Sequence, residues 1–196
     1  MQDLCTFEFL KVEQDIKMVR QLVERIRKKD QRAMSQLYQM YVEELSSVCY
    51  RYVPDEDDAK DVLQNSFVKI FTTISALDYR GEDSFKAWMK RIVANEALGY
   101  LKQRKKLVFV EYNAASQDSV DDEPQPERLS ADEVHKLISE LPDGYRMVVN
   151  LYVFEGYSHR QIAELLSISE RTSASQFYHA KRLLAKSIKD LTRDKR

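Results

Sequence analysis

The sequence predicts an all-α fold of two small helical domains joined by an acidic, flexible linker. Gly and Pro number four each among 196 residues, which is about 4% of the chain against roughly 12% in ordinary proteins. So few turn-forming residues exclude a many-stranded sandwich or barrel. Apolar residues recur every three or four positions over most of the chain, as they do on one face of a helix. Residues 113–126 interrupt this pattern, because Val120 is their one large apolar residue and they carry two of the four prolines.

Three long helices are predicted in the first domain. Pro54 and the carboxylates after it suit the first turn of the second helix. Gly81 interrupts the chain, Ser84 is expected to cap the third helix, and that helix runs to about Lys106. The buried stripes of the first two helices are predicted at Ala33, Leu37, Tyr41, Leu45, Val48 and Tyr52, and at Leu63, Phe67, Ile70 and Ile74. The same spacing at Ile16, Val19, Val23 and Ile26 leaves open an extra helix within residues 1–30.

A helix-turn-helix is predicted near the C-terminus, in a second domain. Ser158 and Gln161 have the spacing of a capping box, in which Ser caps the third amide and Gln bonds back to the cap. Ser169 can cap the last helix, so only about three residues separate the two helices. Ala163 is small enough for the helices to cross there. The predicted boundaries are 1–106 for the first domain, 107–133 for the acidic linker and 134–196 for the second domain.

Charge is distributed unevenly although the net charge is only −1. Residues 80–106 carry eight Lys/Arg and three acids, residues 107–135 carry one Arg and eight acids, and residues 141–196 carry ten Lys/Arg and six acids. Two basic blocks on either side of an acidic one indicate two nucleic-acid-binding units joined by a segment that avoids nucleic acid.

The location predicted from the sequence is cytoplasmic. Cys5 and Cys49 form no CxxC motif, which favours a reducing compartment. The longest uncharged run, residues 33–42, has ten residues, and Thr172–Ala180 has nine; both are far short of the ~20 needed to span a bilayer, so we expect no membrane insertion.

The second helix of the helix-turn-helix is expected to enter a major groove with a polar face outward. Arg and Gln side chains can recognise base edges, while Ser and Thr more often hold phosphates. The alternative is a plain helical hairpin within a bundle. The predicted duplex-binding residues are Arg160, Arg171, Thr172, Ser175, Gln176 and His179.

Residues 85–106 combine cations with aromatic side chains, which is what single-stranded DNA requires, since charges follow the backbone and rings stack on bases. The alternative is that Phe85 and Trp88 are core residues beside a solvated lysine face. The residues predicted to bind unpaired DNA are Lys86, Trp88, Lys90, Arg91, Asn95, Arg104 and Lys105.

An acidic and amide-rich face is predicted on the second helix, opposite its apolar stripe. It contains Asp57, Asp61, Gln64, Asn65 and Val68. Carboxylates do not suit contact with phosphate, so this face is either solvated or binds a basic protein. The DDxxD spacing beginning at Asp57 also occurs in magnesium-binding prenyl-diphosphate synthases, but no second carboxylate cluster accompanies it. We expect no metal, no cofactor and no catalytic residues.

Four of these segments together resemble the sigma-70 family of bacterial RNA polymerase sigma factors, in its small extracytoplasmic-function (ECF) group. The resemblance covers about residues 30–106 and 130–186. The residues that carry it are Asp57-Asp58-Ala59-x-Asp61-x-x-Gln64-x-x-Phe67, Phe85-x-x-Trp88-x-x-x-Ile92-x-x-Asn95-x-x-x-x-Tyr100-Leu101, Leu141-Pro142-x-x-Tyr145-Arg146, Glu155-Gly156-Tyr157-Ser158 and Ile162-Ala163.

This resemblance implies a role for each segment. It implies that Asp57, Asp61, Gln64 and Asn65 bind the beta-prime clamp helices of core RNA polymerase, with the beta flap as a further contact. It implies that the Trp88–Asn95 helix and the preceding loop hold the melted minus-ten promoter element. The helix-turn-helix would recognise the duplex minus-thirty-five element, and the linker would enter the active-site channel. Such proteins commonly have an anti-sigma factor, often anchored in the membrane.

The sequence departs from the family pattern at the helix-turn-helix. Ser167 stands where the family usually has Gly in the turn, and Arg171 and Ala174 stand where Gly and Lys are expected. Gly99 also replaces a common Asp. These departures predict a changed or weaker minus-thirty-five preference. Two other functions remain as alternatives: a helix-turn-helix regulator that never joins the polymerase, and a helical protein-interaction scaffold.

Overall fold

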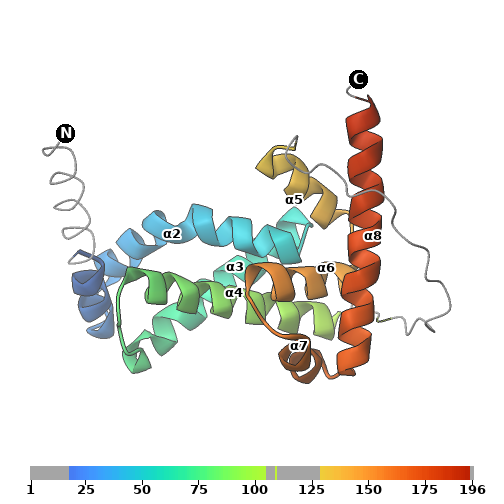
Figure 1. Ribbon diagram of the computed structural model, residues 1–196. Helices are drawn as coiled ribbons and strands as arrows, with labels where there is room; N and C mark the ends of the chain where they lie inside the picture. Colours follow the sequence, from blue (N-terminus) through green and yellow to red (C-terminus); the bar gives the residue numbers. More distant parts are fainter. Residues whose placement is uncertain (1–17, 105–108, 110–128, 195–196) are drawn as a thin grey trace, which may run out of the picture. The chain divides into compact units, whose positions relative to one another are not determined.

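The computed structural model describes residues 18–104, 109 and 129–194 (Figure 1). It separates into two compact units, one of Met1–Cys49 with Glu56–Ala97 and one of Tyr50–Asp55 with Leu98–Arg196. The described residues form helices and turns with no strand, so the predicted all-α class is confirmed. Every helix in the described ranges is too short or too polar to cross a bilayer.

The first unit is built on three long helices. They are α2 (Gln31–Tyr52), α3 (Glu56–Thr73) and α4 (Glu82–Gln103), with a 3-10 turn, η1 (Ile74–Ala76), after α3. The last residues of α2 and of α4 belong to the second unit. All ten residues predicted for the buried stripes of the first two helices are buried, which confirms the register of these helices. Residues 18–27 form a further helix, with Val19, Val23 and Ile26 buried, so the pattern near the N-terminus does mark a helix.

The chain reverses sharply between this N-terminal helix and α2. Lys29 adopts a left-handed φ of 61°, and the Asp30 carboxylate accepts hydrogen bonds from the backbone N–H of Arg32 (2.9 Å) and Ala33 (3.2 Å). These bonds cap α2. The hydrogen bond from Arg25 lowers the pKa of Asp30, and the backbone bonds add to this effect.

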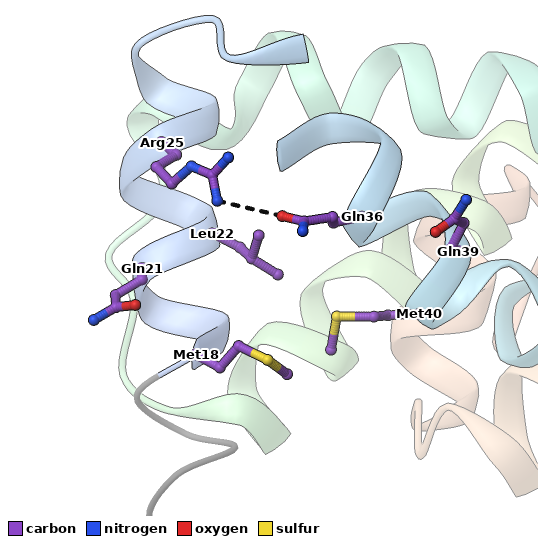
Figure 2. A pocket seen from close by; sticks show the side chains of 7 residues that line it. All are labelled: Met18, Gln21, Leu22, Arg25, Gln36, Gln39 and Met40. Atoms are coloured by element: carbon purple, nitrogen blue, oxygen red, sulfur yellow. Dashed lines mark hydrogen bonds between the residues drawn. The ribbon is translucent and has the colours of Figure 1, made fainter. Parts of the chain in front are cut away.

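A surface pocket of about 450 Å³ lies between the N-terminal helix and α2 (Figure 2). Arg25 Nη1 donates a hydrogen bond to Gln36 Oε1 across it, at 3.3 Å. Its walls are mixed, with two methionines and a leucine beside amide side chains. They comprise Met18, Gln21, Leu22, Arg25, Gln36, Gln39 and Met40.

The ends of α4 differ from the prediction. Gly81 has a φ of 130° and directly precedes the helix, so Ser84 lies inside the first turn and is not the cap. The carboxylates Glu82 and Asp83 occupy that turn, where the positive end of the helix dipole favours them. The helix ends at Gln103, and Lys105 and Lys106 lie outside the described residues.

Four α-helices lie wholly within the described residues of the second unit. They are α5 (Ala131–Ser139), α6 (Asp143–Val149), α7 (His159–Leu166) and α8 (Glu170–Asp194), with a π-helical turn, η3 (Asn150–Phe154), after α6. Both α6 and α7 pack on α8. A small core of Leu141, Val149 and Ala180 is surrounded by Tyr145, Phe177 and Leu184. Most of the predicted linker lies outside the described residues, and the domain boundaries stay a prediction.

Candidate nucleic-acid interface and acidic face

The first helix of the predicted helix-turn-helix, α7, begins with a capping box. Ser158 Oγ accepts from the Gln161 backbone N–H at 3.3 Å, and Gln161 Oε1 accepts from the Ser158 N–H at 2.9 Å. Each side chain satisfies a backbone donor that the helix leaves free. The predicted start of α7 is therefore confirmed.

The turn between α7 and α8 is tight and left-handed. Ser167 has φ 57° and ψ 46°, and the Ile168 N–H donates to Ala163 O at 3.0 Å. Ser169 Oγ then accepts from the Thr172 N–H at 2.9 Å, which caps α8 as predicted. Ser167, which stands where the family usually has Gly, therefore adopts the left-handed backbone conformation that favours Gly.

Two residues predicted to face outward from α8 are buried instead. Thr172 is 6% exposed and Gln176 is fully buried, so neither can contact a base edge without rearrangement of the unit. They share a face with Ser173 and Ala180, and this face packs toward α6 and α7. Thr172 Oγ1 bonds instead with Ser169 Oγ at 2.7 Å.

The residues exposed on the first turns of α8 differ from those that the sequence predicted to be exposed. Arg171 and Ala174 are exposed, Ser175 and His179 are half-buried, and Tyr178 is 40% exposed. Sequence reasoning missed Tyr178, although its position seven residues after Arg171 places both on one helical face.

The start of α7 is fixed against α8 by an aromatic cluster. The His159 ring stacks on Tyr152 at 4.5 Å between centroids, and its Nδ1 lies 3.0 Å from Ser173 Oγ. Phe177 packs on Tyr152 at 4.6 Å. His159 therefore contributes to packing within the unit. Arg160, next in sequence, has a side chain that is 80% exposed, and its Nε lies 3.5 Å from Glu164 Oε1.

The two aromatic residues of α4, Phe85 and Trp88, differ in their burial. Phe85 is buried, whereas Trp88 is half-buried and stacks on Phe85 with 5.7 Å between ring centroids. Arg91 and Asn95 are exposed, and they follow Trp88 at spacings of three and seven residues. These three side chains therefore share one face of α4.

The lysines of this region are held by carboxylates. Lys86 Nζ lies 2.7 Å from Glu82 Oε1, and Lys90 Nζ lies 2.7 Å from Glu44 Oε1. The hydrogen bond that Lys86 donates to the Glu82 carboxylate raises the pKa of Lys86. In the second unit, the Arg104 guanidinium lies 4.9 Å from the Tyr100 ring centroid. Lys105 is outside the described residues.

Every residue of the predicted acidic face of α3 is exposed. Asp57, Asp61, Gln64 and Asn65 are accessible, and Val68 adds an apolar side chain that is 58% exposed. The opposite face of α3 is buried. No three potential metal ligands come together in the described ranges. The exposed face of α3 thus combines carboxylates, amides and one aliphatic side chain, with Lys60 Nζ 3.9 Å from Asp57 Oδ1 at its edge.

Two family models match the chain in order. Residues 37–107, which include most of α2, all of α3 and α4, match "Sigma-70 region 2", and residues 131–184, from α5 into α8, match "Sigma-70, region 4". The RNA polymerase sigma-H factor of Pseudomonas aeruginosa is 30% identical over 190 residues, which cover 89% of this chain and 95% of that protein. The ECF RNA polymerase sigma-E factor of Escherichia coli K12 is 29% identical over 184 residues, covering 88% and 95%.

Among solved structures, CnrH in complex with the cytosolic domain of CnrY aligns with a TM-score of 0.48 and 22% identity, covering 87% of this chain and 97% of that one. The sequence matches extend over both units and agree with the motifs on α3, α4 and the helix-turn-helix. The chain therefore belongs to the sigma-70 family of RNA polymerase sigma factors, in its extracytoplasmic-function group.

Proposed function

We propose that this chain binds core RNA polymerase and directs it to specific promoters. The observation that carries the proposal is the presence of both sigma regions, in order, in a chain that covers 95% of the length of a sigma-H factor. The same observation disfavours a regulator that never joins the polymerase and a helical scaffold, because neither would need both regions.

The α3 face is proposed to bind the beta-prime clamp helices of the polymerase. Asp57, Asp61, Gln64 and Asn65 are exposed together, and their carboxylates would repel DNA phosphates while favouring a basic protein surface. Val68 at the end of this strip would contribute apolar contact area. The helix-turn-helix unit is proposed to bind the beta flap.

The α4 face is proposed to bind the melted minus-ten element. Trp88 offers a partly exposed ring for base stacking, and Asn95 offers an amide that can pair with a base edge. Lys86, Lys90 and Arg91 would bind the strand's phosphates, and Arg104 and Lys105 stay minus-ten contacts predicted from the sequence.

Energetics explain why the polymerase is required. Stacking averages roughly 1.4 kcal/mol per base-pair step, so opening about a dozen pairs costs on the order of 15 kcal/mol. A good base-specific contact contributes only ~1–3 kcal/mol. A small helical unit with a few such contacts cannot hold a bubble open alone, which agrees with a dedicated docking face on α3.

The helix-turn-helix is proposed to bind the duplex minus-thirty-five element. Arg160 on α7 and Arg171, Ser175 and His179 on α8 remain in the proposed contact set, since all four are at least partly exposed. Two further points stay predictions: an anti-sigma factor as a regulatory partner, which the family resemblance implies, and a cytoplasmic location, which the cysteine usage of the sequence favours.

Reconstitution tests the proposal. The purified chain is mixed with bacterial core polymerase, and run-off transcription is measured on a library of genomic fragments from an ECF-containing bacterium. We expect discrete transcripts that are absent with core polymerase alone. If the chain forms no complex with core polymerase at moderate salt, the proposal is wrong. Moderate salt is specified because non-specific phosphate contacts weaken steeply as salt rises.

A further inference from the structure

The face that α8 presents to solvent is uncharged at its centre. Arg171 stands at the N-terminal end of the strip, and the cations Lys181 and Arg182 lie about three turns along it. Between them lie the methyl of Ala174, the hydroxyl of Ser175 and the ring of Tyr178. These positions are spaced by three and four residues, so they form one continuous strip.

This order of side chains dictates what the strip can recognise. In a helix-turn-helix the N-terminal residues of the second helix contact base edges in the major groove. Arg171 carries a fork that fits the two acceptors of guanine. Ala174 has no hydrogen-bonding group, but its methyl is small enough to let the helix approach closely. The apolar group that DNA displays in the major groove is the C5-methyl of thymine.

Tyr178 extends the apolar surface next to Ala174, one turn further along α8. It is 40% exposed although its ring is large. The Arg182 guanidinium lies 6.0 Å from its ring centroid, a cation–π distance that favours a fixed ring position. The ring and the Ala174 methyl together make an apolar surface with a cation beside it.

From this strip we infer that α8 recognises a thymine by packing the Ala174 methyl, with Tyr178 beside it, against the thymine C5-methyl, next to a guanine bound by Arg171. The inference rests on the proposed function, because it names the base chemistry of the duplex element that the helix-turn-helix binds. It also gives a physical meaning to Ala174, which stands where the resemblance led us to expect Lys.

The test uses the full chain bound to core polymerase and a duplex library randomised in the upstream element. After selection, each thymine of the enriched sequence is replaced in turn by deoxyuridine, which removes only the C5-methyl. We expect one replacement to weaken binding about fourfold, the effect of losing one buried methyl. In Ala174→Gly the same replacement should change binding by less than about 1.5-fold.

Ala185→Gly is the matched control. It removes the same methyl from the same helix, three turns beyond Ala174, where the side chain is half-buried. This variant should keep the full fourfold sensitivity to deoxyuridine, so that any loss in Ala174→Gly is not a general effect of Gly in α8. Arg171→Ala should relax the preference for guanine and leave the deoxyuridine effect in place.

The outcomes separate the inference from the proposed function. If an enriched sequence is obtained but no thymine methyl affects binding, or if Ala174→Gly stays as sensitive as the wild type, the inference is wrong and the proposed function stands. If the complex enriches no sequence at all, promoter recognition by the helix-turn-helix is wrong, and the inference falls with it.

Discussion

At the scale of single residues, Ser167 holds a backbone conformation that suits glycine. Its φ of 57° and ψ of 46° lie in the left-handed region at the end of α7. A Cβ in this region crowds the following carbonyl oxygen, whereas Gly has no such penalty. The tight turn is therefore maintained at some cost in stability.

Ser167→Gly should raise the free energy of unfolding by about 0.5–1 kcal/mol, because the Cβ crowding is relieved. Thermal denaturation followed by circular dichroism measures the effect. Gly156→Ala is the opposite control. Gly156 has φ 70°, and a Cβ added there would meet no atom within 4 Å beyond its chain neighbours. The free energy of unfolding should therefore fall by about 1 kcal/mol through backbone strain alone. A lower melting temperature for Ser167→Gly would contradict the account.

Cys49 is predicted to be unreactive in the native protein. Burial raises the pKa of its thiol to about 12 from 9.0, and Sγ donates to Ala59 O at 3.3 Å. In a Cys5→Ser variant, native Cys49 should react with iodoacetamide far more slowly than in urea, because the thiolate fraction is lower by about 10³. Equal rates in the two conditions at pH 8 would refute this.

The sign of the pH dependence follows from the same shift. The native state keeps the Cys49 proton to a higher pH than the unfolded chain does, so the thiol's contribution to stability is complete below pH 9. This contribution falls as pH rises from 9 towards 12. The free energy of unfolding of wild type should therefore decline more steeply above pH 9 than that of Cys49→Ala.

Residue chemistry in the sequence indicated which side chains are polar, but it did not determine which of them are exposed. Thr172 and Gln176 are predicted on the outward face of α8, yet α5, α6 and α7 all pack on this helix, and its buried arc is wide enough to include them. Tyr178 is exposed although its ring is apolar. The width of a buried arc depends on how many helices pack on it, and local sequence does not contain that number.

At the scale of elements, the periodic helices were predictable and their ends less so. The stripes of α2 and α3 are buried as predicted because a 3.6-residue repeat fixes the register of a long helix. The capping box at Ser158 was also correct, since it is a local interaction. The predicted start of α4 was wrong. Ser84 has the side chain of a helix cap, but Gly81 and the two carboxylates after it determine the first turn, so Ser84 lies inside the helix.

The α3 face should bind the polymerase through its charge. Asp61→Arg is expected to weaken binding to core polymerase about tenfold or more, because it places a cation against the basic partner proposed here. The melting temperature should stay within about 1 °C, since Asp61 is exposed. Fluorescence anisotropy with labelled protein measures the affinity.

Glu43→Arg is the matched control for this prediction. It makes the same type of charge reversal at an exposed position on α2, so it changes the net charge equally but leaves the α3 face intact. We expect it to bind core polymerase as the wild type does. Equal weakening by the two variants would mean that net charge, and not the α3 face, governs binding.

At the scale of the whole molecule, the two units carry surfaces of different chemistry. One unit carries the acidic α3 face and the Trp88–Asn95 surface of α4, and the other carries the helix-turn-helix. The sequence predicts two nucleic-acid-binding domains from its two basic blocks and the acidic segment between them, whereas the structural division falls between Ala97 and Leu98, inside the first basic block. The assignment of each surface to its target rests on chemistry: carboxylates for a basic protein, an aromatic ring with cations for unpaired bases, and a capped helix for duplex DNA.

The central claim is that the chain provides part of the binding energy that opens the promoter. Asn95 is exposed, so Asn95→Ala removes its amide without disturbing the core. On a closed duplex, where about 15 kcal/mol of stacking must be offset, the loss of one base contact should reduce transcription about tenfold or more. On a template already melted at the minus-ten element, the reduction should be less than about threefold. Trp88→Ala should behave in the same way.

The most direct measurement is therefore run-off transcription by reconstituted polymerase on matched closed and pre-melted templates, with wild type, Asn95→Ala and the exposed-amide control Gln39→Ala. The account predicts a large defect for Asn95→Ala that is confined to the closed template, and no defect for Gln39→Ala on either. An equal defect for Asn95→Ala on both templates would contradict it.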